Sequence, residues 1–198
     1  MENKEINVNL LEKLEKDKTE KDNLSSSSTA LTEQINLFFE KLRNYIFTLK
    51  VKETASILLS FFNWLKTKEK YNKKKYKTRD IVEVDLGIGY GFEMSYRHPC
   101  IVLKDEAGFC LIVPCSTGKY GKNNKFILDA TPKDGFKQNT GILLDSVRTI
   151  SKTRISNTLG EISVDILEQI NKKMIEFYFP TFNYKYNKLI SKEGSTWL

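Results

Sequence analysis

The spacing of apolar residues changes near residue 75, and this change constrains the fold more than any other feature. Before it, apolar residues recur at intervals of three and four, as they do on one face of a helix. They are Leu31, Ile35, Phe38, Leu42, Tyr45 and Leu49. After it, short β-type runs alternate with turn residues. The sequence therefore predicts a helical N-terminal extension followed by a small β-rich domain.

Within the extension, the spacing predicts a short amphipathic helix inside residues 3–20. It also predicts two longer helices, about 30–50 and 54–68, with one bent helix over the same residues as the alternative. Ser25–Ser28 is a serine linker. Ser28 or Thr29 is available as N-cap of the second helix and Thr54 as N-cap of the third. The apolar stripe has two interpretations, which the sequence leaves open. One is a helical hairpin that packs on its own domain or on a second copy. The other is a helix that occupies a groove meant for a regulatory partner.

The β-rich part contains six predicted strands. They lie at residues 81–86, 100–103, 109–114, 125–128, 141–144 and 148–150, with a hairpin turn at 105–108. Strands this short, without helices between them, indicate a small antiparallel barrel or curled sheet. A helix capped by Ser163 and ended by Pro180 follows. The glycine-rich loop at 87–91 lacks the dinucleotide-binding spacing, and its glycines favour a mobile loop that a ligand approaches closely.

The charge balance favours a phosphate-rich partner. The chain has 198 residues, a formal net charge of +7 and a sequence pI near 9.1. Such an excess suits nucleic acid or an anionic membrane surface, although Lys-rich chains are also basic without a functional reason. Residues 71–79, YNKKKYKTR, fit either a solvated linker or a basic track with tyrosines that stack on bases.

The cysteines and the N-terminus argue against several classes of protein. The three cysteines, Cys100, Cys110 and Cys115, form no CxxC or Cys/His cluster, so neither a disulfide framework nor a zinc site is indicated. The N-terminus lacks the apolar core of a signal peptide, and no apolar run approaches the roughly 20 residues that cross a bilayer. We expect a cytoplasmic protein without a membrane segment, a metal or another cofactor.

The order of four motifs carries a resemblance to a known family. RDIVEVDL (79–86) opens the domain, and RHPCIVL (97–103), VPCSTG (113–118) and DSVRTISKTRI (145–155) follow. In this order they resemble the MazF/PemK family of toxins over about residues 77–178. The most specific parts are the arginine–proline entry to a strand and the VRTISKTRI run.

The resemblance implies an α+β fold: a small SH3-like antiparallel β-barrel of the plasmid-toxin type with a C-terminal helix, preceded here by the helical extension. It implies a toxin that cleaves single-stranded RNA without a metal, a homodimer, and inhibition by a cognate antitoxin. The expected divisions are a charged segment at 1–28, the helical extension and basic linker at 29–75, the barrel at 76–180 and a tail at 181–198.

Metal-independent cleavage of RNA requires a base, an acid and a cation. To cleave RNA without a metal, a base takes the ribose 2′ proton, an acid protonates the departing 5′ oxygen, and a cation stabilises the non-bridging oxygens. By the resemblance, the predicted catalytic residues are Arg97, His98, Ser116, Thr117 and Asp145. The predicted RNA-binding residues are Gly89, Gly91, Glu93, Lys119, Arg148 and Arg154.

One departure from the family pattern affects the site. An arginine precedes the proline in the family, whereas His98, the single histidine of the chain, holds that position and Arg97 precedes it. Neighbouring residues on a strand point to opposite faces. Either His98 replaces the arginine, or a bulge returns Arg97 to the phosphate. We expect both residues to line the site, with Arg97 as phosphate binder and His98 as proton-transfer group.

Two other functions compete with the nuclease. One is a catalytically silent SH3-like module that holds nucleic acid on its basic face. The other is a protein-interaction module of the plasmid-toxin fold that targets gyrase. The arginine and hydroxyl motifs favour the nuclease, because a gyrase-targeting relative would not need them.

Overall fold

The computed structural model describes residues 5–17, 25 and 28–181. Most of the predicted tail at 181–198 and much of the predicted segment at 1–28, including half of its serine linker, lie outside the described residues. The chain divides into two compact units, Met1–Ala55 and Ser56–Leu198, which are described separately below. The domain boundaries expected from the sequence stay predictions.

The first unit contains two of the predicted helices. α1 spans Val8–Lys16 and α2 spans Thr29–Thr48. The Ser28 hydroxyl accepts a hydrogen bond from the Leu31 N–H at 3.3 Å, which confirms Ser28 as an N-cap. The backbone N–H of Asn7 donates to Gln34 Oε1 at 2.7 Å. This bond ties the start of α1 to the first turns of α2.

The third helix begins earlier than the sequence predicts. α3 spans Val51–Thr67, so Thr54 lies inside the helix and is not its N-cap. The Thr54 hydroxyl instead donates to the Ile46 carbonyl, at 3.3 Å, in the last turn of α2. The connection between the two helices is therefore only two residues long, Leu49 and Lys50. From Ser56 onward α3 belongs to the second unit.

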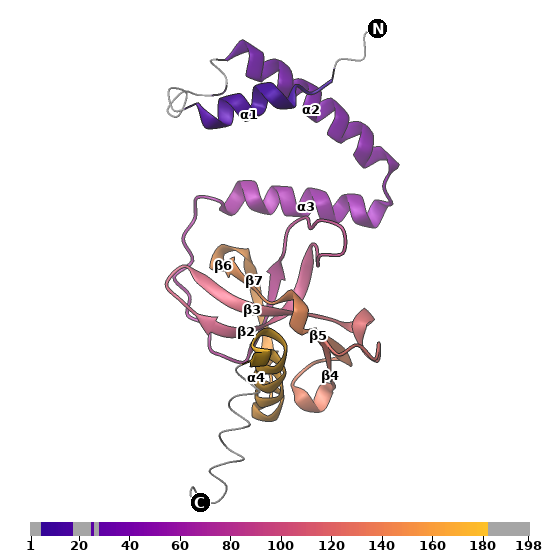
Figure 1. Ribbon diagram of the computed structural model, residues 1–198, viewed down its shortest axis with the longest axis vertical. Coiled ribbons are helices and arrows are strands. Elements are labelled where there is room, and N and C mark those ends of the chain that lie inside the picture. Colours follow the sequence, from indigo (N-terminus) through magenta and orange to yellow (C-terminus); the bar gives the residue numbers. More distant parts are fainter. Residues whose placement is uncertain (1–4, 18–24, 26–27, 182–198) are drawn as a thin grey trace, which may run out of the picture. The chain divides into compact units, whose positions relative to one another are not determined.

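The second unit is built on a seven-stranded antiparallel sheet (Figure 1). Its strands are β1 (Asp80–Asp85), β2 (Arg97–Asp105), β3 (Phe109–Ser116), β4 (Ile127–Ala130), β5 (Thr140–Leu143), β6 (Arg148–Ser151) and β7 (Ile155–Glu161). The order is β4-β5-β3-β2-β1-β7, and β6 also pairs with β3. The six predicted strands are confirmed. β7 was missed because its sequence, ISNTLGE, lacks apolar alternation and its side chains are mostly exposed.

The fold class is confirmed in its main features. The unit combines an antiparallel sheet with a C-terminal helix, α4 (Val164–Tyr178), which Ser163 caps by accepting from the Ile166 N–H at 3.3 Å. Helix α4 ends two residues before Pro180, as predicted. Within residues 28–181, no pairing joins β7 to β4, so the sheet is open at both ends of its order. A closed barrel is therefore not confirmed.

Two apolar clusters lie on opposite faces of the central strands, because successive strand residues point to opposite sides. Ile81, Ile101 and Val113 pack with α4 through Ile166 and Ile170. The alternate residues form the second cluster with Tyr76, Ile150 and Ile155. They include Val82, Val84, Cys100, Val102 and Ile112. The position of a residue along its strand therefore decides which face of the sheet its side chain occupies.

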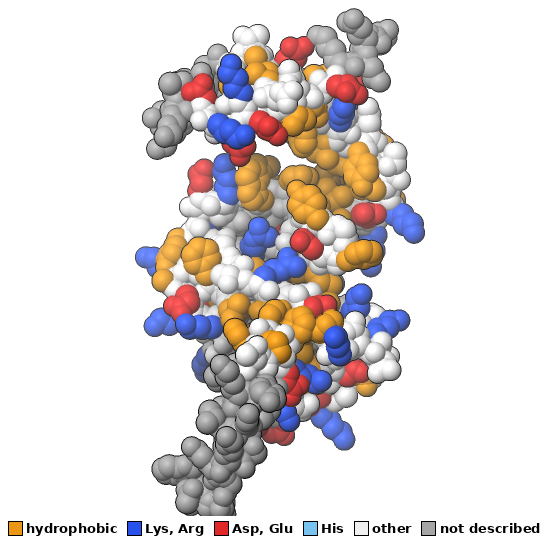
Figure 2. Space-filling model, in the orientation of Figure 1, with side chains coloured by type: hydrophobic (Ala, Val, Ile, Leu, Met, Phe, Trp, Pro, Cys, Tyr) orange, Lys and Arg blue, Asp and Glu red, His pale blue; other side chains and the backbone are white. Residues whose placement is uncertain are grey.

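Several large apolar side chains stay exposed on α3, and Figure 2 shows hydrophobic side chains open to solvent at the level of this helix. Leu58, Phe62, Trp64 and Leu65 are between 53% and 65% exposed. In the part of the chain described, no helix combines the length and the apolar character needed to cross a membrane.

Gly135 is a position where a side chain does not fit. Its φ is +101°, and an added Cβ would overlap the Glu161 carbonyl and lie 3.1 Å from Ile162 Cα. We expect Gly135→Ala to lower the free energy of unfolding by about 2 kcal/mol or more. Gly121 (φ +70°), where a Cβ meets nothing within 4 Å, is the matched control. Gly121→Ala should cost only the backbone strain, about 1 kcal/mol. Urea unfolding of both variants checks this, and equal losses would contradict it.

Candidate functional site

Arg97 and His98 lie on opposite faces of β2. The β1–β2 ladder runs without a break through Val84 opposite His98 and Asp85 opposite Arg97. The register shift on β2 lies further along, between Val102 and Lys104, where β2 pairs with β3. No bulge in this ladder therefore returns Arg97 to the side of His98. The ladder therefore does not bring the two side chains together, and the expected shared site stays a prediction.

His98 instead lies near the end of β3. The β2–β3 ladder ends at the pair of Cys100 with Pro114, and continuing this register by two residues sets His98 opposite Ser116. The hydrogen bonds of the imidazole agree with this placement, because they go to the backbone of Cys115 and of Ser95. Directly opposed residues on an antiparallel pair point to the same face. The imidazole and the Ser116 hydroxyl therefore belong to the same side of the sheet.

The His98 imidazole is neutral at pH 7. Burial lowers the pKa of His98 below its usual value of 6.5, although the backbone hydrogen bonds at Cys115 and Ser95 favour the protonated form. A neutral imidazole has one nitrogen that accepts a proton. In this state His98 is suited to remove a proton from a bound hydroxyl.

Arg148 brings a positive charge to the same face. It pairs with Ile112 across β3 and β6, and Ile112 and Cys100 belong to the same apolar cluster. Burial raises the pKa of the Cys100 thiol to about 12, and the charge of Arg148 opposes this shift. Arg148 is therefore close to the part of β2 that carries His98. It also lines a cavity of about 450 Å³ together with Asp145 and Glu93.

The glycine-rich loop forms the other wall of this cavity, through Tyr90, Phe92 and Glu93. Glu93 Oε2 accepts from the Tyr90 N–H at 3.2 Å, and the Gly89 N–H donates to the Ser95 hydroxyl at 3.0 Å. Glu93, predicted to bind RNA, thus braces the loop backbone. Gly91, with φ +56°, turns the loop.

The remaining predicted residues of this region follow β3. Thr117 and Lys119 lie in an exposed 3-10 turn directly after Ser116. Gly141 holds this turn against β5, because a Cβ there would come within 2.9 Å of the Lys119 carbonyl carbon. Among the residues described, the Ser116 hydroxyl has no hydrogen-bond partner, so it is free to bind a ligand.

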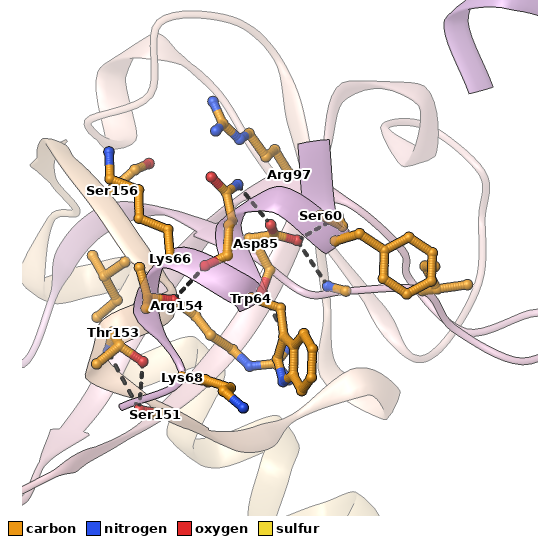
Figure 3. A pocket seen from close by; sticks show the side chains of 16 residues that line it. Ser60, Trp64, Lys66, Lys68, Asp85, Arg97, Ser151, Thr153, Arg154 and Ser156 are labelled. Carbon is orange, nitrogen blue, oxygen red and sulfur yellow. Dashed lines mark hydrogen bonds between the residues drawn. The ribbon is translucent and has the colours of Figure 1, made fainter. Parts of the chain in front are cut away.

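Arg97 and Arg154 lie in a second, larger cavity of about 650 Å³. Figure 3 shows its lining, to which the sheet and α3 both contribute. Arg154 Nη1 donates to the Asp85 carbonyl at 3.3 Å. Gly87 lies beside this guanidinium, because a Cβ added at Gly87 would be 3.1 Å from Arg154 Nη1. The structure therefore separates the predicted residues into a His98–Ser116–Arg148 group and an Arg97–Arg154 group.

Asp85 anchors α3 at the second cavity. Its carboxylate accepts from the Ser60 hydroxyl at 2.8 Å, the Asn63 amide at 2.9 Å and the Gly87 N–H at 3.0 Å. Burial alone would raise the pKa of Asp85, but these three bonds and the Arg154 charge bring it below its usual value. The sequence analysis missed this contact. The available signal was Ser60 and Asn63, polar residues one turn apart within the apolar run ILLSFFNWL (57–65) of this helix.

The described segments contain no group of three or more His, Cys, Asp or Glu side chains placed to hold a metal ion.

Comparison with models of known protein families identifies the family of this chain. Residues 77–178 match the model described as "PemK-like, MazF-like toxin of type II toxin-antitoxin system". This match covers the whole sheet from β1 to β7 and all of α4. The chain belongs to this toxin family, which confirms the resemblance found in the sequence. Helix α3 and the rest of the extension lie outside the match.

Three solved structures are similar to this chain. The crystal structure of MazE–MazF from Deinococcus radiodurans is 19% identical, covering 52% of this chain and 95% of that one, with a TM-score of 0.43. The Mycobacterium tuberculosis toxin MazF-mt6 is 14% identical, covering 50% and 94%, with a TM-score of 0.39. A mycobacterial endoribonuclease in complex with its cognate antitoxin is 18% identical, covering 51% and 92%, with a TM-score of 0.41. No curated protein matches the chain.

Proposed function

We propose that this toxin is a metal-independent endoribonuclease that cleaves single-stranded RNA, and that a cognate antitoxin inhibits it. One observation carries the proposal: a buried histidine hydrogen-bonds to the backbone of Cys115, next to the serine hydroxyl of Ser116, and an arginine lies on the same face. Membership of the toxin family supports the reaction class and the antitoxin partner. The homodimer and the SH3-like barrel expected from the family stay part of the proposal.

The reaction assigns one role to each group. His98 removes the proton from the ribose 2′-OH, and the 2′ oxygen attacks the adjacent phosphorus. A bond forms between O2′ and phosphorus while the bond from phosphorus to O5′ breaks. The protonated His98 returns this proton to O5′, and Asp145, which lines the neighbouring cavity, is placed to orient the reacting groups. The products are a 2′,3′-cyclic phosphate and a 5′-hydroxyl.

Arg148 and Ser116 stabilise the negative charge that develops on the non-bridging oxygens of the phosphate. A guanidinium stays charged and binds two phosphate oxygens through parallel hydrogen bonds. The Ser116 hydroxyl donates to a non-bridging oxygen and reaches it without breaking another hydrogen bond among the described residues. Arg97, which points to the other face, has no part in this step.

We expect the purified chain to cleave a mixed single-stranded RNA in the presence of EDTA and to leave cyclic-phosphate ends. Ser116→Ala should slow cleavage about 100-fold, because it removes one donor to the transition state. Ser116→Thr, which keeps the hydroxyl, is the matched control and should stay within a few fold of the wild type. Retained RNA binding without any cleavage would instead favour the silent binding module.

A further inference from the structure

The larger cavity has the composition of a binding site for a nucleotide. Four of its lining residues are basic, Lys66, Lys68, Arg97 and Arg154, against a single acidic residue, Asp85. The Asp85 carboxylate already accepts three hydrogen bonds. Its volume of about 650 Å³ is in the range of small-ligand sites. The cavity therefore offers an excess of positive charge to an anionic ligand.

Trp64 supplies an aromatic surface at the same cavity. It is 54% exposed, and the Lys68 ammonium lies 5.1 Å from the centre of the indole. Figure 3 shows Trp64 and Lys66 from α3, with Arg97 from β2 and Arg154 from the 3-10 turn between β6 and β7. Aromatic rings beside cationic side chains bind single-stranded nucleic acid, because bases stack on the rings while the cations meet the phosphates.

The glycine-rich loop connects this cavity to the candidate cleavage site. Gly87 and Ile88, at the start of the loop, line the larger cavity. Tyr90 and Phe92, further along it, line the cavity of Arg148. Both aromatic side chains are exposed, Tyr90 by 87% and Phe92 fully. The two cavities and the loop segment that joins them are called the path below, and they carry three aromatic side chains, Trp64, Tyr90 and Phe92.

We propose that this path binds single-stranded RNA and that the larger cavity holds a nucleotide next to the cleaved linkage. Trp64 stacks on its base, and Arg97, Arg154 and Lys66 bind the flanking phosphates. The inference rests on the proposed function and extends it. Half of this subsite comes from α3, which lies outside the family match, so it is a specificity element added by the extension.

The test measures binding separately from cleavage. A fluorescein-labelled single-stranded RNA of mixed sequence, with 2′-fluoro in place of every 2′-OH, cannot be cut by 2′-OH attack and reports affinity by anisotropy. We expect Trp64→Ala in the full chain to weaken binding between about 5-fold and 150-fold. Trp64→Phe keeps a ring and should lose much less. Phe62→Ala is the matched control on α3, with 61% exposure and no place in the cavity, and should have no effect.

The salt dependence tests the phosphate contacts. Lys66→Ala should reduce the slope of log K against log salt by about 0.7, the contribution of one phosphate contact to a single strand. Lys172→Ala on α4 should leave the slope unchanged. Thermal unfolding of each variant shows whether the fold is kept.

The competing occupant of the cavity is an acidic peptide. Trp197→Phe leaves Trp64 as the single tryptophan, so its fluorescence reports occupancy directly. Quenching by the RNA supports the proposal. Quenching by a poly-glutamate peptide but not by RNA, or equal affinities of Trp64→Ala and Phe62→Ala, would overturn it.

Failure of this inference and failure of the proposed function give different results. Trp64-dependent binding without RNA cleavage by the wild type would contradict only the proposed function. Normal cleavage with unchanged binding in Trp64→Ala would refute only this inference.

Discussion

His98→Ala should lower the rate of RNA cleavage by about 100-fold to 10,000-fold, the range that a positioned proton-transfer group contributes. The imidazole faces Ser116 and is neutral at pH 7 because burial lowers its pKa. The wild-type rate should therefore rise with pH through a value below 6.5 and be level at pH 7. His98 is the single histidine of the chain, so this acidic limb should vanish in the variant. Single-turnover rates between pH 4.5 and 8 provide the measurement.

A structural role for His98 makes a different prediction. The imidazole also hydrogen-bonds to the backbone of Cys115 and Ser95, and a glutamine side chain can donate to the same backbone. If His98 only holds the strand ends together, His98→Gln should retain the rate. If His98 transfers the proton, His98→Gln should be as slow as His98→Ala while unfolding at nearly the wild-type temperature. A fast His98→Gln variant would refute the assignment.

Asp105→Asn should lower the free energy of unfolding by about 3 kcal/mol, because it leaves the buried ammonium of Lys152 without its carboxylate. The two side chains are 2.6 Å apart, and that of Lys152 is only 3% exposed. Lys152 Nζ also donates to the Glu106 carbonyl, at 3.2 Å. Urea unfolding at pH 7 gives the loss. Adding Lys152→Met to Asp105→Asn removes the unpaired charge and should recover at least half of it.

The matched control is the ion pair of Lys104 and Glu106 on the surface nearby. Its atoms are 2.7 Å apart, but its side chains are 68% and 60% exposed. Glu106→Ala should leave stability almost unchanged, since water screens this pair. A loss as large as that of Asp105→Asn would show that burial does not decide the effect.

The same pair predicts an acid dependence. Burial would raise the pKa of Asp105, but the hydrogen bonds from Lys152, Cys110 and the Tyr76 N–H lower it below its usual value. A carboxylate with a depressed pKa in the folded state stabilises the protein above its unfolded pKa, about 3.9. Its contribution is lost as the pH falls through the folded pKa. The difference in stability between the wild type and Asp105→Asn should therefore shrink below about pH 4.

Local patterns in the sequence were sufficient to predict most of the helices and strands. Turn residues marked the β2–β3 hairpin, and the interval of three and four marked α2. β7 was missed because its side chains face solvent and its pairing with β1 is decided by distant residues. The start of α3 was misplaced because Thr54 caps nothing and bonds instead to Ile46.

The site was predicted less completely, since it depends on strand register. The alternation of side chains made a separation of Arg97 from His98 foreseeable, but only the unbroken β1–β2 ladder decides between that and a bulge. The approach of Arg148 to the face of His98 follows from the β3–β6 pairing, which joins residues 36 positions apart in the sequence (148 minus 112). The anchoring of α3 by Asp85 likewise joins the extension to the sheet across a separation of 22 to 25 residues.

The central claim, cleavage by attack of the ribose 2′-OH at the His98–Ser116 face, is tested most directly by changing one ribose. The cut site is first mapped on a natural single-stranded RNA in EDTA. The same RNA is then made with a 2′-deoxy sugar on the 5′ side of that linkage alone. The account predicts that this linkage stays intact while the all-ribose RNA yields a 2′,3′-cyclic phosphate and a 5′-hydroxyl. Cutting of the deoxy-substituted linkage at the normal rate would contradict it.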